Sequence, residues 1–213
     1  MAMPSNVRCW VFLALLLSSP SVLAQSGPFK DNSVLLYGFE PFGTFDVNPS
    51  SSLAQRFANK ESSRHAGVLP VSPPEALGAL FKLMERKPRF IIGFGVRADV
   101  EGFEVNVEAT NWISMRTPGE LPFFGSIEAG LPSALGLREA WLERITEVVK
   151  AIGGEAHLST DSGMHACNLT FFQALLHAEA RTRVVFIHVP PDVLERKGLL
   201  RGIERLIDAL TKG

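Results

Sequence analysis

Phe90-Ile91-Ile92-Gly93-Phe94-Gly95 is the stretch of sequence that decides the fold. A short apolar run bounded by turn-forming residues is typical of a strand that is buried on both faces of a sheet. Pro88 ends the segment before this run, and its final glycine allows the chain to turn directly after it. The run therefore predicts the central strand of a parallel sheet.

Helical and extended segments alternate on both sides of this strand. Apolar residues recur at helical spacing in the segment 75–87, and similar amphipathic segments follow. We expect strands at 33–37, 68–71, 90–95, 156–159 and 184–189, and helices at 48–59 (capped by Asn48 or Ser50), 75–87, 137–152, 168–178 and 199–210. This alternation predicts an α/β fold, a single three-layer domain with a mainly parallel twisted sheet and helices on both faces.

Two segments between residues 100 and 132 depart from this pattern. After Gly102 the side chains alternate, with Phe103 and Val105 on one side and Glu104 and Asn106 on the other, which is typical of a half-exposed strand. Residues 110–132 are rich in proline and glycine and have no clear period. Loops of that length are often functional, so we expect a lid-like segment there.

The first residues of the chain have the features of an export signal. Arg8 precedes an apolar run at 10–17 that is too short to span a bilayer, and small residues follow up to Ala24. We therefore expect residues 1–24 to be a signal peptide and residues 25–213 to form an exported domain, periplasmic or secreted. No later stretch is long and apolar enough to predict a membrane contact after cleavage of the signal.

The charge balance argues against some classes of partner. The 213 residues carry a formal net charge of −1, and Lys and Arg are scattered among Asp and Glu. Nucleic-acid-binding proteins usually show a basic stripe, so we expect a small-molecule or peptide partner and no nucleic acid. Neither a metal nor a cofactor is predicted, because four histidines share no ligand spacing with each other or with a carboxylate: His65, His157, His165 and His177.

Cys167 is the only cysteine that remains once the signal peptide, which contains Cys9, is removed. It cannot form an internal disulfide, so it either fills space in the core or is present for its chemistry. It follows a turn and begins a predicted helix, where the helix dipole favours a thiolate and lowers the thiol pKa. His188 stands near the end of a separate predicted strand, where an imidazole can act as a base.

Three segments carry a resemblance to a known family. They are Tyr37 to Gly43 with the following Val47-Asn48-Pro49-Ser50, the segment Ser159 to Asn168 around Cys167, and Phe186-Ile187-His188-Val189-Pro190; Leu69-Pro70-Val71 also fits. In their order and spacing they resemble the motifs of pyroglutamyl peptidase I, a family of cysteine peptidases, over about residues 33 to 205. The resemblance implies a domain of that fold at 25–213, with an acyl-enzyme on Cys167 and His188 as the base.

The resemblance also implies an acid that follows the glycine turn and orients the histidine. Counting without gaps from Gly93 reaches Glu104, which is therefore the expected catalytic acid. Anchoring the count on Arg97 instead places Phe103 at that position. Glu101 and Glu108 are neighbouring carboxylates that remain open as alternatives.

Further residues are implied as substrate contacts. Phe42 and Phe45 resemble the walls of a slot for the flat pyroglutamyl ring, and His165 and Ala166 precede the cysteine. Phe94 stands where the bacterial family commonly has a glutamine near the substrate. The expected function is removal of N-terminal pyroglutamate from small peptides. A non-catalytic peptide-binding homologue and a cysteine amidase for another small acyl group remain alternatives, and a homo-oligomer remains open.

Overall fold

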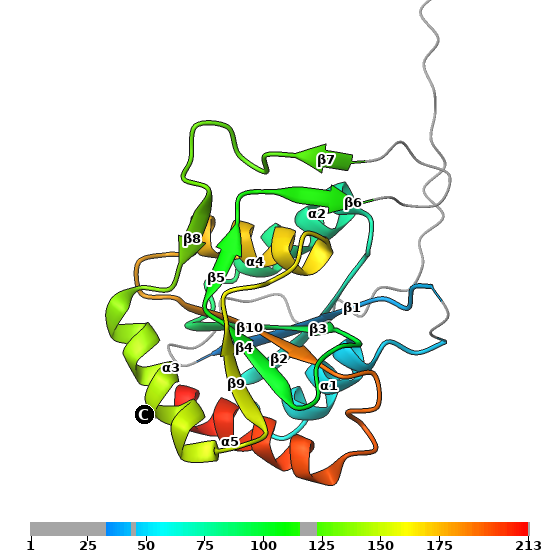
Figure 1. Ribbon diagram of the computed structural model, residues 1–213, viewed down its shortest axis with the longest axis vertical. Helices are drawn as coiled ribbons and strands as arrows, with labels where there is room; N and C mark the ends of the chain where they lie inside the picture. Colours follow the sequence, from blue (N-terminus) through cyan, green and yellow to red (C-terminus); the bar gives the residue numbers. More distant parts are fainter. Residues whose placement is uncertain (1–32, 44–45, 116–122, 213) are drawn as a thin grey trace, which may run out of the picture.

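The computed structural model describes residues 33–43, 46–115 and 123–212 (Figure 1). Its centre is a six-stranded sheet in the order β2-β1-β3-β10-β4-β9. All neighbours in it are parallel except β4 and β10, which pair antiparallel. The strands are β1 (Val34–Phe39), β2 (Arg64–Leu69), β3 (Phe90–Val96), β4 (Phe103–Asn106), β9 (Ala156–Ser159) and β10 (Arg183–Val189). The prediction of a mainly parallel sheet around residues 90–95 is confirmed.

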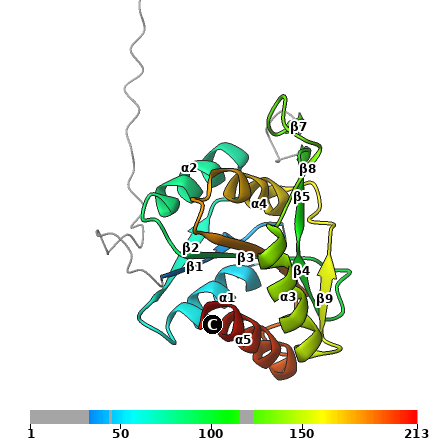
Figure 2. The ribbon, with the colours of Figure 1, turned by 90° about the vertical axis from the view of Figure 1, so that its left-hand side faces the viewer.

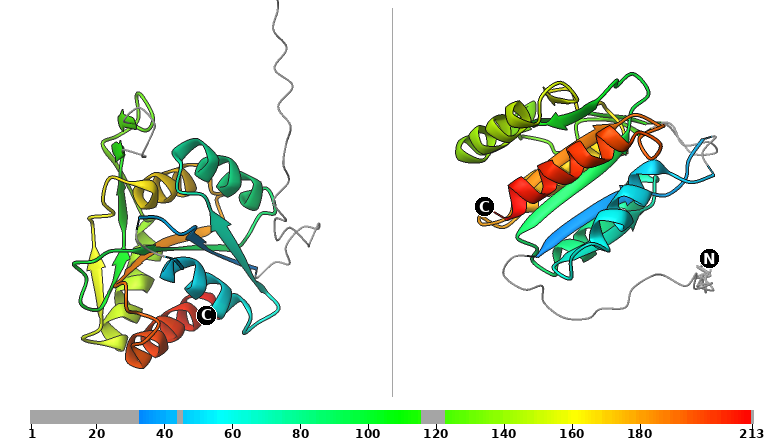
Figure 3. Two further views of the ribbon diagram at one scale, coloured as in Figure 1. Left: turned by 90° about the vertical axis from the view of Figure 1, so that its right-hand side faces the viewer. Right: turned by 90° about the horizontal axis from the view of Figure 1, so that it is seen from below.

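Helices cover both faces of this sheet, as Figures 2 and 3 show. On one face lie α1 (Pro49–Ala58), α3 (Glu139–Ile152) and α5 (Lys197–Thr211), and on the other lie α2 (Pro73–Met84) and α4 (Ala166–His177). Asn48 caps α1, because its side chain accepts a hydrogen bond from the backbone amide of Ser50. The three-layer α/β prediction is therefore confirmed.

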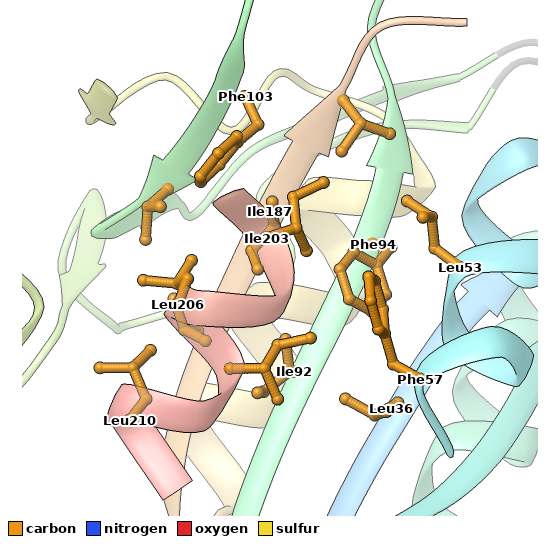
Figure 4. Packing of buried hydrophobic residues seen from close by; sticks show 14 of the residues in the cluster. Leu36, Leu53, Phe57, Ile92, Phe94, Phe103, Ile187, Ile203, Leu206 and Leu210 are labelled. Carbon is orange, nitrogen blue, oxygen red and sulfur yellow. The ribbon is translucent and has the colours of Figure 1, made fainter. Parts of the chain in front are cut away.

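Two apolar cores pack on the two faces of the sheet. The core on the α1 and α5 side contains Phe94, whose ring lies 6.2 Å from that of Phe57, together with residues of β4 and β10 (Figure 4). The core on the α2 and α4 side contains Tyr37 and Phe186. Side chains alternate along each strand, so neighbouring residues of β3 contribute to opposite cores.

Residues 108–115 and 123–136 form more structure than the sequence predicts. Two small antiparallel sheets pair β5 (Glu108–Thr110) with β8 (Ala134–Gly136), and β6 (Ile113–Met115) with β7 (Phe123–Gly125). Each of these strands has three residues, which is too short to give a recognisable period. The second sheet is tied to the turn before α4, because the backbone amide of Ser114 donates to the carbonyl of Met164 at 2.7 Å.

The predicted signal peptide, residues 1–24, lies outside the described residues, and so does Phe45. In the part of the chain that the structure describes, no helix combines the length and apolar character needed to cross a bilayer.

Gly38 offers a direct test of how closely α1 packs on β1. A Cβ built at Gly38 would lie 2.3 Å from the carbonyl carbon of Ser50, which is backbone and cannot move aside. Gly38→Ala is therefore expected to lower the free energy of unfolding by about 3 kcal/mol in urea denaturation. Gly78→Ala is the matched control, because Gly78 lies inside α2 and the added carbon would have no neighbour within 4 Å other than the backbone of its own helix. This change should raise stability by about 0.5 to 1 kcal/mol. Equal effects of the two changes would contradict this account of the packing.

Candidate active site

Cys167 is the second residue of α4, which has His165 as its N-cap and begins at Ala166. The helix begins where the ends of β3 and β10 meet, so the cysteine faces the carboxyl edge of the parallel strands, where α/β sheets bind ligands. The first amides of a helix have no acceptor within it, and here they lie beside the thiol. The position of Cys167 at a helix start is the one that the sequence predicts.

Gly95 brings the thiol and His188 together. A Cβ built at Gly95 would lie 2.6 Å from Sγ of Cys167 and 3.1 Å from Cδ2 of His188. Both groups therefore occupy the space over the end of β3 that a side chain at residue 95 would take. The pair expected from the sequence is close in space, although its members come from a helix and a strand 21 positions apart along the chain.

His188 is buried and makes a side-chain contact with Asn106. Its Nδ1 lies 2.7 Å from Oδ1 of Asn106, and the two residues are 3% and 0% exposed. The amide nitrogen of Asn106 donates in turn to the backbone carbonyl of Asp161 at 2.9 Å. The sequence predicts Asn106 only as part of a half-exposed strand. Its complete burial marks it as part of the site, and this burial cannot be predicted from the sequence alone.

The structure places Glu104 differently from the expected orienting acid. Glu104 lies opposite His188 in the antiparallel register of β4 and β10, but Oε2 of its carboxylate lies 3.3 Å from a guanidinium nitrogen of Arg97. The same guanidinium also pairs with Asp99 at 3.0 Å and with Asp161 at 2.8 Å. The expectation for Glu104 is therefore corrected: the ring contact is made by Asn106, because Arg97 engages the carboxylate.

The two alternative carboxylates lie elsewhere. Glu101 is exposed in the bend before β4, and Glu108 begins β5, outside the main sheet. Neither position belongs to the group of side chains around His188 described above.

Burial sets the charge state of the two reactive groups. It raises the pKa of the Cys167 thiol to about 12, and it lowers the pKa of His188 to about 4, with the Arg97 guanidinium acting in the same direction. The expected lowering of the thiol pKa by the helix start is thus outweighed by desolvation. At neutral pH the pair is a thiol and an uncharged imidazole, so the thiolate forms when the proton passes to His188 during attack.

Asn168, directly after the cysteine, holds the neighbouring segment in place. Its Oδ1 accepts from the backbone amide of Thr110 at 2.9 Å and from the hydroxyl of Ser162 at 2.6 Å. Its amide nitrogen donates to the carbonyls of Thr110 at 2.9 Å and Trp112 at 2.8 Å. This buried asparagine therefore fixes β5 and the residues after it against the start of α4.

The structure places the residues expected to contact substrate on both sides of the sheet. Phe42 is 42% exposed in the loop after β1, and His165 and Ala166 border the cysteine at the helix start. The expectation that Phe94 contacts substrate is corrected. Its side chain is fully buried against Phe57, in the core on the opposite face of the sheet from α4 (Figure 4). Within the described ranges, no three His, Cys, Asp or Glu side chains are grouped so that they could hold a metal ion.

A family model described as pyroglutamyl peptidase matches residues 32–197. This chain belongs to that family. A pyrrolidone-carboxylate peptidase of Thermococcus litoralis is 32% identical over 181 residues, covering 79% of this chain and 82% of the relative. A second, from Gloeobacter violaceus, is 30% identical over 197 residues, covering 83% and 96%.

Solved structures agree with this assignment. The pyrrolidone carboxyl peptidase from Thermococcus litoralis superposes with a TM-score of 0.72 at 27% identity, over 84% of this chain and 93% of that one. The enzyme from Thermus thermophilus gives a TM-score of 0.69 at 25% identity, over 84% and 98%. The fold of this chain is that of the pyroglutamyl peptidase family.

The raised pKa of Cys167 predicts a particular pH dependence for alkylation. Only the thiolate reacts with iodoacetamide, so the second-order rate for Cys167 at pH 7 should be at least tenfold below that of free cysteine, whose pKa is about 8.5. The rate should continue to rise beyond pH 9. Mass spectrometry of the peptide that carries Cys167 gives the rate, with the urea-unfolded chain as control. A fast rate that is constant from pH 6 to 9 would instead indicate a preformed thiolate.

Proposed function

We propose that this chain is a cysteine peptidase that removes N-terminal pyroglutamate (5-oxoproline) from peptides. The observation that carries the proposal is the meeting of Cys167 and His188 over Gly95. It occurs in a chain that the pyroglutamyl peptidase model matches over residues 32–197. The names of the relatives, pyrrolidone-carboxylate peptidases, support the same substrate class.

The site supports a two-step acyl transfer. Sγ of Cys167 attacks the carbonyl carbon of the pyroglutamyl residue while its proton passes to Nε2 of His188. In this proposal the backbone amides at the start of α4 bind the oxyanion that forms. The C–N bond then breaks, the leaving amine takes the proton from His188, and a thioester remains. His188 next takes a proton from water, which attacks the thioester and releases pyroglutamate with the thiol restored.

Phe42 supports recognition of the lactam ring. It is a partly exposed aromatic side chain in the loop after β1, and an aromatic face suits a flat five-membered ring. The loop is anchored near this point, because the side-chain amide of Asn48 donates to the carbonyl of Glu40 at 3.0 Å. With Phe94 in the core, the family's glutamine has no equivalent side chain at this position of the site.

A peptide-binding protein without turnover is the second candidate. The observation that favours it is the neutral amide of Asn106 at the ring of His188, where an acid is expected. The two functions are separated by whether the purified chain hydrolyses a substrate at all.

Turnover of a pyroglutamyl conjugate of a chromogenic amine tests the proposal. We expect release of the amine by the wild-type chain, and a fall in kcat/KM of at least about 10³-fold in Cys167→Ala and His188→Gln, because each removes one member of the pair. His177→Gln is the matched control and should retain activity, since it lies at the far end of α4. Prolyl and acetyl conjugates of the same amine serve as competing substrates. Hydrolysis of one of these in preference to the pyroglutamyl conjugate would contradict the proposed specificity.

We further propose that the enzyme acts outside the cytoplasm, in the periplasm or as a secreted protein, because residues 1–24 have the pattern of a signal peptide. Expression in a Gram-negative host should give an exported chain that begins at Gln25, as determined by N-terminal mass spectrometry after fractionation. Leu15→Arg interrupts the apolar run and should retain the chain in the cytoplasm. Wild-type protein recovered in the cytoplasm with Met1 intact would contradict the proposal.

A further inference from the structure

We propose that Asn106 is the residue that orients His188, so that the site is a Cys–His–Asn arrangement in which, among the described residues, an amide and not a carboxylate makes the hydrogen bond to the base. The catalytic consequence of this inference rests on the proposed function. The positioning itself does not, because it concerns the state of the imidazole in the resting protein.

The sheet register places Asn106 beside the histidine. Strand β4 runs antiparallel to β10, with Glu104 opposite His188 and Asn106 opposite Phe186. Residues two apart on a strand share a face, so both Glu104 and Asn106 project toward α4, the side of the sheet on which His188 lies. Of these two, Asn106 makes the hydrogen bond to the ring, at 2.7 Å.

A second hydrogen bond fixes which way the amide of Asn106 points. The backbone carbonyl of Asp161 can only accept, so the amide group that lies 2.9 Å from it must be the NH₂ of Asn106. Oδ1 therefore faces the imidazole, and because Oδ1 can only accept, Nδ1 must carry the proton. Nε2 is then left with its lone pair.

That lone pair lies on the side of the ring where a base is needed. Nε2 is bonded to Cδ2, the ring atom that lies over Gly95 together with Sγ of Cys167. The contact with Asn106 thus selects the tautomer that can accept the thiol proton, and it holds the ring at the edge of the sheet. An asparagine supplies this orientation without a charge.

The charged groups around the ring are paired with one another. Arg97, from the loop after β3, binds Glu104 on β4, Asp99 in its own loop and Asp161 in the loop after β9. The pKa of His188 is lowered to about 4 by burial and by Arg97, against smaller opposing effects of Asp161 and Asp99. Because Asn106 is neutral, it brings no negative charge to the ring that would raise this pKa. The base therefore stays uncharged, and able to accept a proton, well below pH 6.

Nitrogen-15 NMR of the histidine rings tests the inference without any substrate. In the wild type we expect His188 to be in the Nδ1–H form from pH 5.5 to 8, with its Nδ1 proton protected from exchange. Asn106→Ala should lose that protection and give a mixture of tautomers. Asn106→Asp keeps the shape and the acceptor, so it should keep the Nδ1–H form while raising the imidazole pKa by at least one unit. Asn59→Ala, at an exposed asparagine at the end of α1, is the matched control.

Kinetics provide the second measurement. We expect Asn106→Ala to lower kcat on the order of 10- to 100-fold with little change in KM, since it disturbs the base and not the binding of substrate. Asn106→Asp should recover most of kcat, with the acid limb of the kcat/KM profile moved to higher pH. Glu104→Gln should keep the wild-type tautomer and lose less than tenfold.

The outcomes separate this inference from the proposed function. If the wild type has no turnover but the tautomer depends on Asn106, the enzyme proposal fails and the positioning stands. If the wild type turns over while Asn106→Ala keeps the Nδ1–H form and full kcat, the inference is overturned. A larger loss in Glu104→Gln than in Asn106→Ala also overturns it, because the carboxylate would then be the orienting group.

Discussion

The close approach of α4 to strands β3 and β10 is the constraint on which the site depends. Gly93 and Gly95 lie on the same face of β3, and neither position has room for a side chain. A Cβ at Gly93 would lie 2.5 Å from the rings of Tyr37 and Phe186, and one at Gly95 would lie 2.6 Å from Sγ of Cys167. The first glycine admits aromatic packing beneath α4, and the second admits the reacting pair. The same feature of the sequence therefore serves both the core and the chemistry.

Much of this arrangement could be predicted from the sequence. The apolar run at 90–95 and the alternation of strands and helices are enough for the three-layer fold, since a parallel sheet buried on both faces gives continuous apolar strands. The positions of Cys167 at a helix start and His188 at a strand end also follow from local patterns. The motifs around them, taken in order, are what indicated the family.

Other parts of the site depend on contacts that no local pattern contains. Glu104 and Asn106 are one pleat apart on the same face, so counting along the chain cannot decide which one reaches His188. The decision comes from Arg97, which engages the carboxylate, and from the carbonyl of Asp161, which orients the amide. The burial of Phe94 away from the site could have been predicted from the sequence. Glycines at 93 and 95 mark the face that α4 approaches, and alternation then directs Phe94 into the opposite core.

The balance between burial and the helix dipole determines how the cysteine works. The first turn of a helix favours a thiolate, but desolvation of the partly buried Cys167 acts in the opposite direction and raises the pKa of its thiol to about 12. The resting site is consequently uncharged at its centre, with an uncharged base and a neutral amide behind it. Charge appears only during attack, when the helix-start amides can stabilise it. Because the resting pair is neutral, transfer of the thiol proton depends on the orientation of the His188 imidazole.

The most direct test of the account is to identify the covalent intermediate. A single turnover of a pyroglutamyl ester, stopped in acid within milliseconds and digested, should yield the peptide that contains Cys167 with the added mass of one pyroglutamyl group. The same experiment with His188→Gln should yield little or none of this product. Hydrolysis of the ester with the acyl group on another residue, or with no acylated Cys167 at any time during turnover, would contradict the assignment of Cys167 as the nucleophile.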